Sequence, residues 1–331
     1  MKTFCLATTA LWACLLVWAA TGSGAQGKLL SAYISDSPSA SVPAWIAKDT
    51  GIYKKYGLDI DLVFIDGSTR GIQSLLAGDL SFTEAVGTSA INGRIAGGEI
   101  AIVNGDVNTL PYYVIGKANI KSREDLKGRT AAVHIPGTAA DFALRLALKQ
   151  VGIPYNQINA ITVGGGPARI SSVITGQTDF TIVSDAEKIQ GERSGLKVVI
   201  DMAALKVPFL YTCMVTTRRL IREQPSAVQR MVEVTVEAIH FFKTRKEESI
   251  KIMSKYTRGP SRVILEGAYA AYSQLFVEDT YPSVEGLRNT LEVQSSWDPK
   301  VAKAKVEDFV DLRFVDQLRT SGFIDKLYGR K

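Results

Sequence analysis

Two stretches of this chain, 98 residues apart, follow the same pattern of glycines and apolar residues. The first runs from Gly67 to Phe82 and the second from Gly165 to Phe180. In each, a Gly-rich turn precedes apolar residues at i, i+3 and i+4, which is typical of a short helix with one buried face. Another glycine follows, and glycine ends a helix readily because it has no Cβ to oppose a left-handed conformation. The repeat predicts two similar α/β lobes, and a cleft between lobes is where small ligands bind.

The N-terminus has the pattern of a secretory signal peptide. Lys2 supplies a positive charge, Phe4–Ala20 is an apolar run with two threonines, and small residues lead to Ala25, after which we expect cleavage. A membrane anchor is the alternative, but the run is shorter than the roughly 20 residues needed to span a bilayer. A lipoprotein anchor at Cys14 is a weaker alternative, because the apolar run continues beyond it. We therefore expect residues 1–25 to be removed and the protein to reside in the periplasm.

Composition excludes several classes of function. The full chain carries a net charge of +6, but its Lys and Arg are interleaved with Asp and Glu, so we expect no nucleic-acid partner. Only Cys213 lies beyond the signal, so no internal disulfide is expected. Two histidines and one distant cysteine give no metal-ligand spacing. The mild positive charge slightly favours anionic ligands.

Strand and helix patterns alternate in the order β-α-β-α-β in both halves of the mature chain. This order favours parallel sheets covered by helices. Two β-rich segments, near Tyr112 and Leu210, are the predicted crossings between lobes, and extended crossings would form a hinge. We expect strands at 29–34, 57–64, 100–104, 130–135, 158–163, 180–183 and 198–200, β-rich runs at 110–116 and 207–217, and helices at 42–49, 139–151, 227–243, 247–256, 262–278, 299–321 and 323–328.

Four short phrases in a fixed order connect the chain to a known family. The phrases are Gly51-Ile52-Tyr53 with Tyr56-Gly57-Leu58-Asp59-Ile60, then Leu76–Phe82, then Asp125–Arg129, and finally Leu318–Asp325 with Phe309 and Asp316 shortly before it. In this combination the chain resembles the solute-binding proteins of ABC importers, in the group for alkanesulfonates, taurine, nitrate and thiamine-pyrimidine precursors. The resemblance spans nearly all of the mature chain.

The resemblance implies both a fold and a function. The fold is α/β, of the type II periplasmic-binding-protein class, with two doubly wound lobes joined by a two-crossing hinge. Lobe 1 would comprise residues 26–115 plus 206–331, and lobe 2 residues 116–205. The implied function is capture of a small anionic or zwitterionic organic solute between the lobes and its delivery to the permease subunits of an importer, by a monomer that is not an enzyme and holds no cofactor.

Two alternatives come from other functional classes. An exported sensor subunit would use the same ligand-binding fold. A pyrimidine-synthase-like enzyme shares it too, but that branch relies on a lysine, histidines and a cysteine-rich iron segment, and this chain has no cysteine cluster. The sequence does not identify the solute.

The candidate ligand-binding residues follow from the general geometry of doubly wound sheets. Ligands sit beyond the carboxyl ends of the strands, where helix N-termini offer free N–H groups and a positive dipole end. Thr88 and the pair Gly137-Thr138 are the strongest candidates, although capping a helix is the ordinary role of a hydroxyl at such a position. The full set is Ser35, Ser37, Gly67, Ser68, Thr83, Glu84, Gly87, Thr88, Asn108, Tyr112, Pro136, Gly137, Thr138 and Asp185.

Several charged and aromatic residues have two interpretations. Glu84 could pair with a cationic part of the solute, or form a salt bridge with Arg70 or Arg94. Arg70 and Arg169 lie near equivalent helix starts and could clamp an anion, although a solvated surface position is more common for each. Tyr112 could contact the solute or belong to the core. Structural roles are expected for His134, His240 and Cys213.

Overall fold

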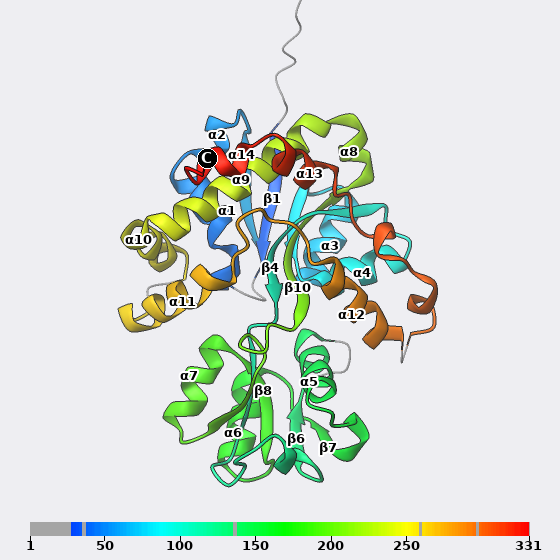
Figure 1. Cartoon of the computed structure of the whole chain (residues 1–331), viewed down its shortest axis with the longest axis vertical. Helices are drawn as coiled ribbons and strands as arrows, with labels where there is room; N and C mark the ends of the chain where they lie inside the picture. The colour runs from blue at the N-terminus through cyan, green and yellow to red at the C-terminus, as the bar shows by residue number, and fades with distance from the viewer. Residues whose placement is uncertain (1–27, 35–37, 135–137, 258–259, 296–297, 331) are drawn as a thin grey trace, which may run out of the picture.

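Two five-stranded sheets, one in each of two lobes, organise the chain (Figure 1). The protein is described by a computed structural model over residues 28–34, 38–134, 138–257, 260–295 and 298–330. The predicted signal peptide lies outside the described residues. The two-lobed α/β architecture predicted from the repeat is confirmed.

The sheet of the first lobe has the strand order β2-β1-β3-β10-β4. β1 pairs in parallel with both β2 and β3, whereas β10 is antiparallel to β3 and β4. The strands are β1 (Leu29–Ile34), β2 (Ile60–Ile65), β3 (Phe82–Ala85), β4 (Ile100–Thr109) and β10 (Pro208–Thr217).

The second sheet repeats this arrangement with the order β7-β6-β8-β5-β9. β6 is parallel to β7 and β8, and β5 is antiparallel to β8 and β9. The strands are β5 (Tyr112–Gly116), β6 (Thr130–Val133), β7 (Asn159–Thr162), β8 (Phe180–Ser184) and β9 (Lys197–Asp201).

The sheets are mostly parallel, as the order of elements favoured, but one strand in each sheet is antiparallel. β5 enters the second sheet directly from β4 of the first, after only Leu110 and Pro111. β10 returns from β9 after residues 202–207. A strand that enters from the other lobe starts at the edge of the sheet where the parallel strands of that sheet end. It therefore runs antiparallel to them. We call the region of these two crossings the waist. β5 forms its hydrogen bonds within the second sheet. The lobe boundaries predicted from the sequence instead placed its first residue, Tyr112, in lobe 1. Those boundaries as a whole stay a prediction.

Helices cover both sheets, and the longest of the described helices, α9, forms part of the core of the first lobe. α9 lies against α1, whose Trp45 is 1% exposed. The N-terminal and middle helices are α1 (Val42–Asp49), α2 (Ile52–Lys55), α3 (Ser68–Ala77), α4 (Gly87–Ile95), α5 (Ala139–Gln150), α6 (Gly166–Ile174) and α7 (Asp185–Arg193). The later helices are α8 (Arg218–Glu223), α9 (Pro225–Thr244), α10 (Lys246–Tyr256), α11 (Arg262–Leu275), α12 (Val284–Ser295), α13 (Arg313–Thr320) and α14 (Phe323–Leu327).

The C-terminal region departs from the sequence prediction around α12 and before α13. Residues 299–321 were predicted as a single helix, but only short 3₁₀ turns precede α13. The backbone of Ile102 in β4 accepts from Asp311 N and donates to Phe309 O, each at 2.8 Å, which holds this segment extended beside the sheet. Tertiary pairing has therefore overridden a local helical pattern. α12 had no counterpart among the predicted helices.

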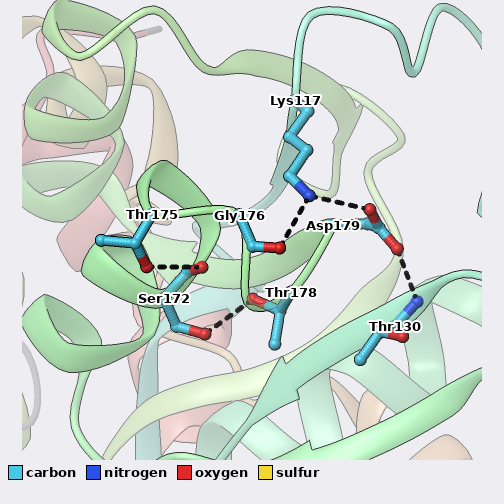
Figure 2. Close-up of polar contacts among 7 residues, drawn as sticks. All are labelled: Lys117, Thr130, Ser172, Thr175, Gly176, Thr178 and Asp179. Atoms are coloured by element: carbon cyan, nitrogen blue, oxygen red, sulfur yellow. Dashed lines mark hydrogen bonds and ion pairs between the residues drawn. The ribbon is translucent and has the colours of Figure 1, made fainter.

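The turn that ends each repeat follows the predicted chemistry. Gly78 and Gly176 have positive φ values of 88° and 83°, in the left-handed region that favours glycine. After the second turn, Asp179 accepts from the Thr130 amide at 3.0 Å and from Lys117 Nζ at 3.0 Å (Figure 2). Partial burial tends to raise the pKa of Asp179, but these hydrogen bonds and the nearby cation outweigh it, so its pKa lies below the usual range. The side chain ties the end of α6 to the start of β6.

Candidate functional site

The carboxyl ends of the parallel strands in both lobes converge on the waist. In the first sheet, Ala85 at the end of β3 pairs with Cys213, in the middle of β10, and Gly87 two residues later packs on Leu210, nearer the start of that strand. In the second, Ser184 at the end of β8 pairs with Tyr112, the first residue of β5. Since β5 and β10 both begin at the waist, the segments that follow β3 and β8 lie there too. This is the position at which open α/β sheets bind ligands.

In the first lobe, the start of α4 is packed against the second crossing. A Cβ at Gly87 would lie 2.6 Å from the Leu210 carbonyl oxygen, so only glycine allows this approach. The next residue, Thr88, is 5% exposed. The structure therefore brings two predicted site residues, Gly87 and Thr88, to the waist, and their contact with a solute stays a prediction.

In the second lobe, Thr138 is the N-cap of α5. Its hydroxyl accepts from the Asp141 amide at 3.4 Å, which is the capping role that the sequence left open beside ligand contact. Asp185 begins α7, but its side chain is not among those described. The remaining predicted site residues on these turns, Ser35, Ser37, Pro136 and Gly137, lie outside the described residues.

Other predicted polar residues of the first lobe have partners within the protein. The Ser68 hydroxyl accepts from the Val86 amide at 2.9 Å, and the Thr83 hydroxyl donates to the Glu84 carbonyl at 2.9 Å. Gly67, with a φ of 89°, precedes α3 as its N-cap. These contacts fix the turn between β2 and α3 and the end of β3. They give both hydroxyls a structural role, and the assignment of Gly67, Ser68 and Thr83 to the solute site stays a prediction.

Asn108, near the end of β4, anchors the segment that leads into α12. Its Nδ2 donates to the Tyr281 carbonyl at 2.7 Å, and its Oδ1 accepts from the Ser283 amide at 2.9 Å. Both ends of the amide group are therefore used in joining the crossing to α12. Its assignment to the solute site stays a prediction.

Glu84 forms neither of the predicted salt bridges. Arg70 pairs with Asp66 at 3.3 Å and Arg94 with Glu99 at 2.6 Å, both away from Glu84. Glu84 instead faces the interior of the first lobe, where it is 4% exposed and hydrogen-bonded to Ser41. Its burial raises the pKa to about 8, because a carboxylate loses its hydration there.

The sequence favoured a solvated surface position for Arg169, but this residue of α6 is buried and only 3% exposed. Its guanidinium donates to the Gly164 carbonyl at 2.6 Å, the Ile182 carbonyl at 3.0 Å and the Thr181 hydroxyl at 3.2 Å. Desolvation lowers its pKa, but an arginine remains charged at any physiological pH. The side chain therefore joins the Gly-rich turn of the repeat to the first half of β8.

Aromatic residues from both lobes line the waist. Tyr112 is 8% exposed and meets Tyr211 edge-to-face, with ring centroids 6.0 Å apart. Phe142 of α5 packs on Phe209 of β10 at 5.1 Å. The sequence analysis missed Phe209 and Tyr211, although their place in the predicted second crossing was a usable signal.

A pocket of about 490 Å³ lies between α5 of the second lobe and α12 of the first. An ion pair crosses it, with Lys149 Nζ 2.5 Å from Glu292 Oε1. Arg145 also lines it and stacks over Tyr155, with 4.0 Å from guanidinium to ring centroid. Of the predicted site residues that the structure describes, none lines this pocket.

Two of the three residues expected to be structural have apolar or backbone partners. Cys213 is fully buried and its thiol donates to the Ala85 carbonyl at 3.3 Å. His240 packs edge-on against Tyr328, with centroids 4.7 Å apart, and burial lowers its pKa. His134 lies half-buried after β6.

Within the described ranges there is no group of three or more His, Cys, Asp or Glu residues able to hold a metal ion. None of the described helices has the length and apolar character to span a bilayer.

Comparison with known proteins gives consistent results at the level of family and fold. The family described as NMT1/THI5 like matches residues 39–249. A protein of Brucella abortus (strain 2308) that carries the general name of binding protein is 30% identical over 239 residues, covering 68% of this chain and 70% of its own length.

Solved structures share the fold at lower identity. The sulfonate-binding protein SsuA from Methylobacillus flagellatus KT superposes with a TM-score of 0.71 at 15% identity, covering 92% of this chain and 96% of that one. The periplasmic aliphatic sulphonate binding protein SsuA from Escherichia coli gives a TM-score of 0.65 at 18% identity, covering 76% and 84%.

Proposed function

Because the chain belongs to the NMT1/THI5-like family, we propose that it is the extracytoplasmic solute-binding component of an ABC importer. The observation that carries this proposal is the convergence of strand ends from two similar sheets on one waist crossed by two segments. Such an arrangement suits capture of a small molecule between two lobes that move about the crossings. In this role the protein releases its solute chemically unchanged.

The solute that we propose is a small anionic or zwitterionic organic molecule. The N-termini of α4 and α5 support this, because both helices begin after strands that end at the waist, and a helix N-terminus favours an anion through its dipole and its first N–H groups. The sulfonate-binding names of the two structural neighbours point the same way, although identities of 15% and 18% support only the shared fold.

The proposed mechanism is closure of the lobes around the solute. The solute bridges helix N-termini of both lobes, and the backbone of the two crossings takes up the rotation. The closed form then presents the outer surfaces of both lobes to the membrane subunits of the importer. We propose that the protein acts in the periplasm as a monomer.

A thermal-shift screen tests this function. The panel is taurine, alkanesulfonates, nitrate, aromatic carboxylates and pyrimidines, with no cofactor added. A ligand that binds the folded state at 100 times its Kd stabilises the protein by about 2.7 kcal/mol, which the melting temperature reports. We expect at least one anion to raise the melting temperature without being consumed, and X-ray scattering to show compaction at saturation. Turnover of a panel member, or no compaction with a bound one, would contradict the proposal.

Thr138 and Thr217 give a matched pair of variants for locating the site. Both are N-caps whose hydroxyl accepts from a backbone amide, at the start of α5 and α8 respectively. Replacing either with valine removes a capping bond at a cost of about 1 kcal/mol. We expect only Thr138→Val to weaken binding of the ligand found in the screen, because α8 follows the end of β10 remote from the waist. An unchanged affinity in Thr138→Val removes Thr138 from the site.

A further inference from the structure

Glu84 and Asp106 are two buried carboxyl groups that the proposed solute site does not use. They are 4% and 3% exposed, and they line one small enclosed cavity in the first lobe, together with Tyr53 of α2 and Thr235 of α9. Among the described residues that line this cavity there is no Lys, Arg or His. Two ionised carboxylates without a cation would be strongly unfavourable there, since each loses its hydration and repels the other.

The hydrogen bonds of Ser41 show which form Glu84 takes. The Ser41 hydroxyl lies within hydrogen-bond distance of two oxygens, Glu84 Oε2 and the carbonyl oxygen of Ile34, the latter at 3.4 Å. A hydroxyl has one hydrogen to donate and can also accept. If Glu84 were ionised, both neighbours would be acceptors and would compete for that single hydrogen. If Glu84 is protonated, both contacts can be made at once.

We propose that Glu84 is a positioning residue that acts as a neutral carboxylic acid. Its O–H donates to Ser41 Oγ, and the Ser41 O–H donates to the Ile34 carbonyl. Ile34 is the last residue of β1, and Ser41 directly precedes α1. The chain of two hydrogen bonds therefore ties β3 to both ends of the β1–α1 connection, one of the segments that follow a strand at the waist. The inference holds without a bound solute, so it stands or fails separately from the proposed transport function.

Burial and the acidic groups that face Glu84 favour its neutral form. Hydrogen bonds with Ser41 and with the Ile34 backbone lower the pKa of Glu84, but burial outweighs them. Tyr33 of β1, Tyr53 of α2, Asp106 of β4 and Cys213 of β10 are acidic groups close enough to interact with it. α1 and α9 contribute only uncharged residues to the cavity. Burial raises the pKa of Glu84 to about 8 and that of Asp106 to about 7, above the values of about 4 that these groups have in an unfolded chain.

The sign of the pH dependence follows from these shifts. Between about pH 4 and pH 8 the folded state binds more protons at this pair than the unfolded state does, so stability falls as the pH rises. The stabilisation is fully present below about pH 4 and is lost as the pH passes through the folded-state pKa values. The attachment of β3 to the start of α1 through Ser41 should loosen over the same range.

Thermal unfolding from pH 5 to pH 9 tests the proposal on the protein without solute. We expect the wild-type melting temperature to fall by roughly 5 °C or more across this range. Glu84→Gln supplies an N–H₂ donor that cannot ionise, so it should match the wild type at pH 5 and decline less at pH 9. Asp106→Asn removes the second titrating carboxyl group, so it measures how much of the wild-type decline comes from Asp106. A Glu84→Gln variant that keeps the whole wild-type decline overturns the proposal.

Two measurements keep the test decisive if Glu84→Gln does not fold. The infrared spectrum of the wild type at pH 6 should contain the C=O stretch of a buried protonated carboxylic acid, and its absence overturns the proposal. Hydrogen exchange of the α1 amides, corrected for intrinsic rates, should speed up towards pH 9 relative to those of α13. Equal behaviour of the two helices also overturns it, because a general loss of stability would affect both.

Discussion

Arg169 and Arg70, which the sequence treated alike, should respond very differently to mutation. The buried Arg169 guanidinium makes three hydrogen bonds, so Arg169→Met leaves acceptors without a partner inside the second lobe. We expect a loss of roughly 2–4 kcal/mol in the free energy of unfolding. Arg70→Met removes one exposed pair and should change it by less than about 0.5 kcal/mol. Urea denaturation measures both.

Arg169→Lys separates the geometry of this group from its charge. A lysine keeps the positive charge but offers one nitrogen, which cannot reach the Gly164 and Ile182 carbonyls and the Thr181 hydroxyl in the same fork. It should therefore recover only part of the loss. If Arg169→Lys were as stable as the wild type, the charge alone would account for the effect.

At the scale of single residues, the sequence predicted location better than role. Thr88 and Thr138 were expected after strands at the interlobe region, and the structure places both there. The roles of Glu84 and Arg169 could not be predicted, because they depend on partners 43 and 12–13 positions away in the chain. Asp106 left no signal in the sequence, because the predicted strand ended at residue 104 and only the structure extends β4 to Thr109.

The two copies of the repeated element satisfy the same backbone amide in different ways. At the end of β3, the Val86 amide donates to the Ser68 hydroxyl at 2.9 Å. At the equivalent end of β8, the Ser184 amide donates to the Glu187 carboxylate at 2.9 Å. Gly166 occupies the repeat position of Ser68, and a Cβ there would overlap the Glu187 carboxylate. Glycine in one copy and serine in the other thus follow from which group supplies the acceptor.

This relation predicts compensation between two substitutions. Gly166→Ser should displace the Glu187 carboxylate, and Glu187→Ala should leave the Ser184 amide without its acceptor, each costing about 1–2 kcal/mol. Combined, the new serine can accept from Ser184 as Ser68 does from Val86, so the double variant should be more stable than the sum of the single effects by at least about 1 kcal/mol. Denaturation of the four proteins measures this coupling, and simple additivity would contradict the proposed equivalence.

At the scale of elements, local pattern predicted most helices and strands but not how they pair. The boundaries of α1 and β1 agree with the predictions, because apolar spacing and flanking turn residues specify them locally. The antiparallel placement of β5 and β10 depends on the chain passing between lobes, which no short window of sequence reports. The extended segment near Phe309 is held by β4, more than 200 residues earlier, and local periodicity suggested a helix there.

At the scale of the molecule, α12 joins the body of the first lobe to the second crossing. Gly286 of α12 lies directly on Phe209, and a Cβ there would be 2.6 Å from the backbone N and Cα of that residue. Backbone atoms cannot move aside as a flexible side chain would. Asn289 of the same helix donates to the Pro208 carbonyl at 3.0 Å, so the contact continues along the start of β10. The position of α12 and the path of the crossing are therefore coupled.

Gly286→Ala should act on both stability and the relation of the lobes. The added methyl group forces α12 away from the crossing, and we expect a loss of roughly 2–3 kcal/mol, typical of overpacking in a closely packed interior. Because the displaced backbone belongs to a crossing, X-ray scattering should also show altered overall dimensions.

Gly267→Ala is the matched control, since Gly267 is also helical but nothing lies within 4 Å of the position that its Cβ would take. There alanine should stabilise the protein by about 0.5–1 kcal/mol through its higher helix propensity and leave the scattering unchanged. Were Gly286→Ala to lower stability without changing the dimensions, α12 would be a packing element of the first lobe alone, and the rotation of the lobes would have to depend on the crossings without it.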